Sequence, residues 1–180
     1  MSSVYLLFPT LEGIFRGMQD ELFMGMCLEE ATKALIADEV PVGAVVVSSG
    51  KVIGRAHNLT VQLNSPLAHA ELLAIAEAAG TLGNFRLTDC TLYVSKEPCL
   101  MCAGAIQEAR IRRVVFGCFD AKRGAMGSAC DVNTLPSNHR IEIRGGLFAQ
   151  ESGDLLKKFF HARRDTEAVV TGPTRNRLSA

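Results

Sequence analysis

The chain has 180 residues and a mass of 19.4 kDa, a size that suits one domain with its own hydrophobic core. Apolar residues make up 48% of the chain and charged residues 21%, proportions that exclude a disordered, collagen-like or low-complexity protein. Lys and Arg together number 19, as do Asp and Glu, so the formal net charge of zero gives no sign of a polyanionic partner.

The charges are unevenly distributed along the chain. Residues 1–50 carry seven acidic and two basic side chains, a balance of −5. Two other stretches are basic: residues 108–123, with a balance of +3, and residues 155–180, with a balance of +4. A short basic stretch is most often a solvated surface, and the alternative is a face that contacts phosphates.

Cysteine usage and hydropathy indicate the cellular setting. Six cysteines occur with no secretory signal before them, which favours reduced thiols over disulfides. The longest internal apolar stretch, residues 40–47, is far too short to span a membrane. We therefore expect a cytoplasmic protein that does not associate with membranes.

The first half of the chain alternates helical and strand patterns. Apolar residues at helical spacing predict the first helix, and Val-rich segments around Ser49-Gly50 predict a strand pair with a tight turn. The expected elements are a helix over residues 18–38, strands over 42–48 and 51–56, a loop over 58–67 and a helix over 68–82. His69 and Glu71 fall in the first turn of that last helix.

The second half continues the alternation. The expected elements are a strand over residues 91–95, a helix over 99–110, a buried strand over 113–117, a Gly-rich loop over 122–128, an edge strand over 141–144 and a helix over 152–164. The apolar side of the last helix is assigned to Leu155, Leu156, Phe159 and Phe160. Such alternation indicates an α/β/α layered domain. We assign the domain to residues 18–166, between a poorly patterned N-terminal extension over 1–17 and a flexible tail over 167–180.

Two short motifs carry potential metal ligands: His69-Ala70-Glu71 (H-x-E) and Pro98-Cys99-Leu100-Met101-Cys102 (P-C-x-x-C). Zinc accepts imidazole and thiolate ligands, and a catalytic zinc site uses three protein ligands and leaves a fourth position for water. At this composition, chance yields H-x-E roughly 0.3 times and P-C-x-x-C roughly 0.007 times per chain. The second motif is therefore the specific one. We predict one zinc ion held by His69, Cys99 and Cys102.

Other interpretations of the same residues stay open. A core helix can carry two buried thiols beside a hydrogen-bonded histidine, and a C-x-x-C pair can be a redox site. A structural zinc site needs a fourth ligand, for which His57 or Cys90 is available. Glu71 can simply stabilise the helix, because a negative charge near a helix N-terminus interacts favourably with the helix dipole. Beside a zinc-bound water, Glu71 can instead take a proton from that water and deliver it to a ring nitrogen and a departing amine.

The two motifs together match the signature of the zinc-dependent nucleobase deaminases. Further segments narrow the resemblance: residues 41–47, 84–87, 91–94, 113–117, 120–122, 138–140 and 159–160. Over residues 20–164, the chain resembles bacterial tRNA-specific adenosine deaminases of the TadA type. Ser65, Leu67 and His161 depart from that pattern.

The resemblance implies a three-layer α/β/α cytidine deaminase-like fold with a mixed central sheet of about five strands. It implies hydrolytic deamination of adenosine to inosine at the wobble position of a tRNA anticodon, by attack of a zinc-bound hydroxide with Glu71 as the catalytic proton shuttle. It also implies one zinc ion per subunit, a homodimer, and a tRNA anticodon stem-loop as the partner.

The resemblance also implies which residues bind the substrate. Asn58 matches an asparagine that holds the purine, and the alternative is a turn former. Asp120 matches a residue near the ribose, where contact with a 2′-hydroxyl selects RNA; the alternative is a loop carboxylate paired with Lys122 or Arg123. The remaining candidates, each either a substrate contact or plain surface, are Lys122, Arg123, Phe160, Arg163 and Arg164.

Two other functions are alternatives. One is deamination of a free base or nucleotide, such as guanine or cytosine, by a member of the same superfamily; such a substrate needs no basic face, so the basic stretches favour RNA. The other is a noncatalytic, zinc-stabilised RNA-binding subunit. Such a subunit often lacks the acid/base glutamate, and Glu71 is present.

Overall fold

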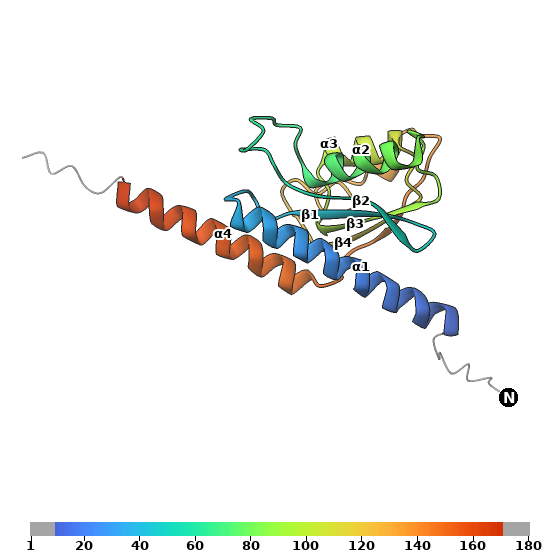
Figure 1. The fold of residues 1–180 in the computed structure, drawn as a ribbon, viewed down its shortest axis with the longest axis horizontal. Coiled ribbons are helices and arrows are strands. Elements are labelled where there is room, and N and C mark those ends of the chain that lie inside the picture. Colours follow the sequence, from blue (N-terminus) through green and yellow to red (C-terminus); the bar gives the residue numbers. More distant parts are fainter. Residues whose placement is uncertain (1–9, 171–180) are drawn as a thin grey trace, which may run out of the picture.

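The computed structural model describes residues 10–170, in which a mixed five-stranded sheet carries helices on both faces (Figure 1). The elements in chain order are α1 (Leu11–Ile36), β1 (Gly43–Ser48), β2 (Lys51–His57), α2 (Ala70–Leu82), β3 (Cys90–Lys96), α3 (Leu100–Glu108), β4 (Arg113–Cys118), a 3-10 turn η1 (Val132–Thr134), β5 (Glu142–Arg144) and α4 (Ala149–Val170). The predicted three-layer α/β/α arrangement with a mixed sheet of five strands is confirmed.

The sheet has the strand order β2-β1-β3-β4-β5. The first two strands form the predicted hairpin, whose turn residues Ser49 and Gly50 both have positive φ, the conformation that two-residue hairpin turns require. Strand β1 pairs antiparallel with β3, whereas β3, β4 and β5 run parallel. The segments that follow β3 and β4 therefore leave the same edge of the sheet, where ligands bind in open α/β folds.

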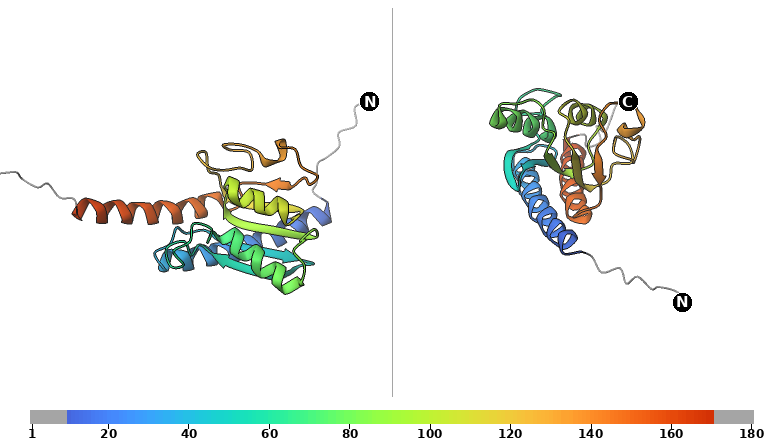
Figure 2. Two further views of the ribbon diagram at one scale, coloured as in Figure 1. Left: turned by 90° about the horizontal axis from the view of Figure 1, so that it is seen from above. Right: turned by 90° about the vertical axis from the view of Figure 1, so that its right-hand side faces the viewer.

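Helices α2 and α3 cover one face of the sheet, and α1 and α4 cover the other (Figures 1 and 2). Alternate residues of β1 pack on opposite faces of the sheet. Ala44 and Val46 pack in the core beneath α2 and α3, whereas Val45 and Val47 pack with Phe23 of α1. A strand buried on both faces shows a continuous apolar run. This explains the Val-rich composition of the segment.

The N-terminal helix is longer than predicted. It begins at Leu11, where the Thr10 hydroxyl accepts the N–H of Gly13 at 3.2 Å, rather than at Met18. Leu11 and Phe15 are 75% and 66% exposed, so the first turns of this helix are not buried against the core. Part of the expected unpatterned extension is therefore helical, and residues 1–9 lie outside the described residues.

The last helix is also longer than predicted. Helix α4 starts at Ala149 and continues to Val170, past the expected end at residue 164 and into the segment assigned to a tail; residues 171–180 lie outside the described part of the chain. Its C-terminal half projects beyond the sheet (Figure 2). Among the described residues, we find no helix that is both long and apolar enough to cross a membrane.

Candidate active site

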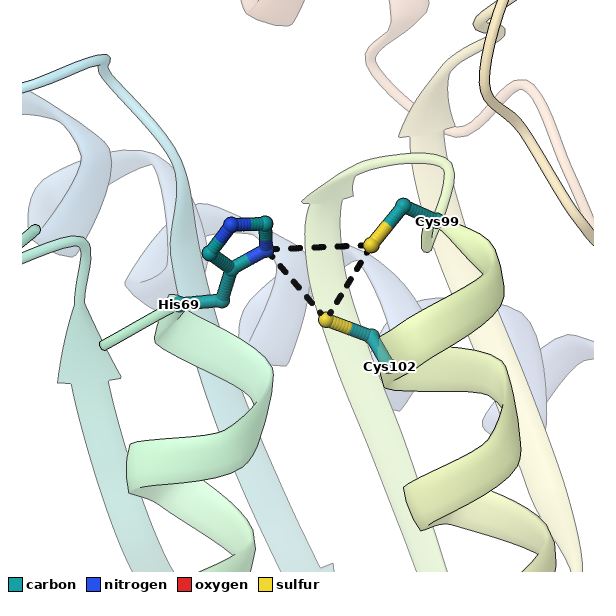
Figure 3. A group of neighbouring side chains, drawn as sticks. All are labelled: His69, Cys99 and Cys102. Carbon is teal, nitrogen blue, oxygen red and sulfur yellow. Dashed lines mark hydrogen bonds between the residues drawn. The ribbon is translucent and has the colours of Figure 1, made fainter. Parts of the chain in front are cut away.

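The three predicted metal ligands lie together where two neighbouring helices begin (Figure 3). His69 occupies the position immediately before α2, Cys99 the position immediately before α3, and Cys102 lies in the first turn of α3. A backbone bridge between Cys99 and Gly124 fixes the start of α3 against the loop that follows β4. Two helix N-termini, with their partial positive charge, therefore face one point.

The distances between the ligand atoms fit a zinc ion. The Sγ atoms of Cys99 and Cys102 are 3.6 Å apart, and Nδ1 of His69 lies 3.8 Å from the first sulfur and 3.4 Å from the second. Tetrahedral zinc with its usual bond lengths places two sulfur ligands about 3.8 Å apart and a sulfur and a nitrogen ligand about 3.6 Å apart. The donor set and its geometry thus fit one zinc ion, with Nδ1 as the histidine ligand.

The three groups perturb one another's protonation. The hydrogen bond between the two sulfurs, together with His69, lowers the pKa of Cys99 to about 3. The same contact with Cys99, together with burial, raises the pKa of Cys102 far above its ordinary range. The hydrogen bond to Cys99 raises the pKa of His69. A thiolate at neutral pH is the form of cysteine that binds metal.

Glu71 lies in the first turn of α2, two residues after His69. Its carboxyl group is buried, and burial raises its pKa. A carboxyl group with a raised pKa exchanges protons more readily near neutral pH, as general acid-base catalysis requires.

A cavity of about 260 Å³ opens beside these residues. His69, Glu71, Cys99 and Asn58 all line it, which places the predicted purine-binding asparagine next to the metal ligands. The Oδ1 atom of buried Asn58 accepts the N–H of Ala70 at 2.9 Å. The rest of the wall consists of Val40, Val42, Thr60, Lys96, Glu97 and Arg123.

The loop after β4 carries three further candidates, Asp120, Lys122 and Arg123. Of these, Arg123 lines the cavity in the described structure. The Oδ1 atom of Asp120 accepts the backbone N–H groups of Lys122 and Arg123 at 3.0 and 3.1 Å. Its ion pair is with Lys96, so the alternative interpretation of Asp120, a side-chain pair with Lys122 or Arg123, is wrong.

The candidates on α4 line a second hollow of about 380 Å³, which shares Val40 with the first cavity. Phe160, Arg163 and Arg164 all contribute to its wall. Arg163 also donates to the carboxylate of Asp38 at 3.0 Å. The assignment of Phe160 to the buried side of α4 is wrong, because Phe159 is buried and Phe160 is 48% exposed.

Three residues that shape the cavity were not predicted from the sequence. Buried Glu97 accepts three backbone N–H groups of the loop after β4, and Lys96 pairs with Asp120. Buried Glu39 accepts the N–H groups of Val61 and Gln62, both at 2.8 Å, in the loop before α2. The available signal for Lys96 and Glu97 was their position at the end of β3, directly before the P-C-x-x-C motif. Glu39 was hidden among the acidic residues of the first 50.

Comparison with known proteins identifies the family. The family model described as "Cytidine and deoxycytidylate deaminase zinc-binding region" matches residues 18–118. The chain belongs to this deaminase family. The deaminase is 46% identical over 149 residues to a tRNA-specific adenosine deaminase of Bacillus subtilis (strain 168), which covers 81% of this chain and 91% of that protein. It is 43% identical over 152 residues to a tRNA-specific adenosine deaminase of Haemophilus influenzae, and this match covers 83% of this chain and 88% of that protein.

Solved structures agree with this assignment. A structure from a study of A-to-I editing by tRNA:A34 deaminases matches the deaminase with a TM-score of 0.71 and 44% identity, over 75% of this chain and 99% of that chain. A guanine deaminase from Nitrosomonas europaea matches with a TM-score of 0.66 and 26% identity, over 88% of this chain and 98% of that chain. The predicted resemblance to tRNA-specific adenosine deaminases is confirmed.

Proposed function

We propose that the deaminase converts adenosine to inosine at the wobble position of a tRNA anticodon and releases ammonia. One observation carries the proposal: the two metal ligands His69 and Cys99 line a single cavity together with Glu71 and Asn58, and this cavity adjoins a hollow lined by Arg163 and Arg164. Relatives that are 43% and 46% identical are named tRNA-specific adenosine deaminases, which supports the choice of substrate.

The proposed mechanism assigns one task to each residue. His69, Cys99 and Cys102 would hold one zinc ion, which would lower the pKa of water at the site to about 7. Glu71 accepts one proton from the attacking water and passes it to a nitrogen of the adenine ring. It then takes the second proton from the hydroxyl group newly added to the ring carbon and delivers it to the amine, which leaves as ammonia when its bond to that carbon breaks. Burial of Glu71 supports this role, because it raises the pKa toward the range in which a carboxyl both accepts and donates.

The substrate base enters the cavity unstacked. Val40 and Val42 offer an apolar wall to the base, and Asn58 offers its amide nitrogen. An unpaired base in an anticodon loop costs less to extrude than a paired base. The arginines of α4 then contact loop phosphates outside the cavity.

The second candidate is deamination of a free purine, which the structural match to a guanine deaminase favours. That neighbour is 26% identical, compared with 46% for the Bacillus relative. A free base also leaves Arg163, Arg164 and Phe160 without a substrate to contact. We therefore rank this function below action on tRNA.

We further propose that the deaminase works as a homodimer in the cytoplasm. Leu67 and Leu100 are 60% and 57% exposed although each lies within two residues of a metal ligand in the sequence. A second copy that covers them removes apolar surface from water. Sedimentation of the protein and of Leu100→Glu tests this: a dimer that Leu100→Glu dissociates supports the proposal, and a monomeric protein at micromolar concentration contradicts it.

The decisive experiment uses purified protein with one zinc ion per chain. We expect inosine to form in a tRNA that carries a wobble adenosine, and no inosine to form in the same tRNA with a wobble guanosine or cytidine. Parallel reactions with free guanine, cytosine and adenosine measure released ammonia. Ammonia from a free base without inosine in tRNA would overturn the proposed function.

A further inference from the structure

Two consecutive residues, the last residue of β3 and the one that follows it, hold the loop that carries Asp120. Glu97 is buried, and its Oε2 atom accepts the backbone N–H of Asp120 at 3.0 Å. Its Oε1 atom accepts the N–H groups of Met126 and Ser128 at 3.0 and 3.1 Å. One carboxylate therefore joins the beginning and the end of the loop.

The loop is shaped to receive this carboxylate. A Cβ atom at Gly124 would lie 2.3 Å from the carboxyl carbon of Glu97, which is too close for a non-bonded contact. Glycine at this position therefore leaves space for the carboxylate. The N–H of Ala125 also donates to the carbonyl of Pro98 at 2.8 Å. Three backbone donors need a group that only accepts, as a carboxylate does and an amide does not.

Lys96 holds the side chain of the same aspartate. Its ammonium group pairs with Oδ2 of Asp120, whereas Oδ1 accepts the backbone N–H groups of Lys122 and Arg123. The hydrogen bond with Lys96 and those two donors outweigh the effect of burial and lower the pKa of Asp120. Lys96 also lines the cavity beside the metal ligands.

We propose that Lys96 and Glu97 are positioning residues that fix the direction of the Asp120 carboxylate and thereby set how strongly the deaminase prefers RNA over DNA. The proposal rests on the proposed function, in which Asp120 contacts the ribose 2′-hydroxyl. Glu97 fixes the main chain of Asp120. Lys96 and the two backbone donors fix its carboxylate plane, so that a free lone pair points to one place. Without Lys96 the carboxylate turns about its side-chain bonds, and the contact with the hydroxyl weakens.

The test compares two RNA hairpins that differ only at the target, adenosine in one and 2′-deoxyadenosine in the other. The measured quantity is the ratio of the two kcat/KM values. We expect Lys96→Met to lower this preference for the ribose about three- to tenfold. Lys96→Arg keeps the positive charge, and we expect it to restore most of the preference.

Two variants separate this inference from the proposed function. Asp120→Asn tests the contact with the hydroxyl itself: if it leaves the ratio unchanged, the role of Asp120 is wrong. If Asp120→Asn lowers the ratio and Lys96→Met does not, the role of Asp120 stands and the inference about Lys96 is overturned. If Lys96→Met lowers both kcat/KM values equally, Lys96 is a general substrate contact, and the inference is again overturned.

Glu97 is tested by a readout that does not need turnover. We expect Glu97→Gln to speed hydrogen exchange of the amides of residues 120–128 at least about tenfold while α1 keeps its protection. The matched control is Asp20→Asn: Asp20 is a fully buried carboxylate at the opposite end of β4, where it pairs with Arg113. We expect the control to keep the wild-type ribose preference. Unchanged hydrogen exchange in Glu97→Gln would overturn the assignment of Glu97. A fall of the ribose preference in Asp20→Asn as large as the fall in Lys96→Met would also overturn the assignment, because loss of any buried ion pair would then have the same effect.

Discussion

The side-chain oxygen of Asn58 accepts the backbone N–H of Ala70 at 2.9 Å, so this residue caps the helix that begins beside the metal ligand His69. The contact uses the carbonyl end of the side chain. The amide nitrogen is the end that we assign to the purine. Asn58 therefore has a structural task and a substrate task that different atoms perform.

Two substitutions separate these tasks. Asn58→Asp keeps the acceptor for Ala70, so we expect a free energy of unfolding close to that of the unaltered protein, but it removes the donor, and kcat/KM falls about 100-fold. Asn58→Ala removes both, and we expect an additional loss of about 1 kcal/mol of stability. Urea unfolding and inosine formation measure the two effects. Full activity in Asn58→Asp would exclude the amide as a substrate donor.

Glu71→Gln removes the proton shuttle while preserving the shape of the side chain. We expect the variant to bind one zinc ion and to lose about 1,000-fold in kcat/KM, since a neutral amide neither accepts nor delivers the proton. The matched control is Glu77→Gln, on the exposed side of the same helix, which should keep its activity. An active Glu71→Gln would remove Glu71 from the mechanism.

Removal of the metal should abolish turnover. We expect dialysis against a chelator to eliminate inosine formation, and one equivalent of Zn²⁺ per chain to restore it, whereas Mg²⁺ does not. Elemental analysis of Cys102→Ser should show less than one zinc ion per chain. Activity that survives complete chelation would contradict a metal-dependent reaction.

The buried carboxylate of Glu30 makes stability depend on pH in the acidic range. Burial opposes its ionised form, but Lys33, His57 and Arg55 lower its pKa from 4.5 to about 2. A lowered folded-state pKa stabilises the protein above the ordinary pKa, and that stability is lost as pH falls toward the folded value. We expect Glu30→Gln to be about 3 kcal/mol less stable at pH 7, and the difference to shrink between pH 4.5 and pH 3.

Equilibrium unfolding in urea at a series of pH values measures this difference. A gap between the two proteins that stays constant from pH 7 to pH 3 would show that the ion pairs of Glu30 do not stabilise the fold.

The α4 arginines should contribute to the salt dependence of tRNA binding. We expect Arg164→Gln to weaken binding and to reduce the slope of log K against log salt by about 0.7 to 0.9, the change for one lost phosphate contact. Arg86→Gln is the control, because Arg86 stacks on the ring of Phe85 in the loop after α2. Equal slopes for both variants would contradict a phosphate contact at Arg164.

The sequence predicted the order of the elements and the metal ligands because their signals are local. Val-rich strands, a Ser-Gly turn and ligands three residues apart on a helix depend on neighbours in the chain. The tasks of Glu97 and Lys96 could not be predicted, because they depend on a loop that folds back more than 20 residues later in the sequence. Long-range hydrogen bonds of this kind leave no periodic pattern.

The charge balance of residues 1–50 likewise does not reveal which acidic side chains are buried. Asp20, Glu30 and Glu39 are three of the seven acidic residues in the first 50, and all three are buried. They hold Arg113, Arg55 and the loop before α2, respectively. The acidic balance of that segment therefore reflects interior ion pairs and loop anchors to a large extent, which composition does not distinguish from a negatively charged surface.

His69 and Cys99 occupy the N-cap positions of α2 and α3, and neither side chain caps its own helix. Serine or aspartate at such a position typically makes a helix more stable by about 1 kcal/mol. Selection for stability alone would therefore favour replacing these two residues, which bind the metal. Continued selection for chemistry is what keeps histidine and cysteine at two positions where folding alone would prefer other residues.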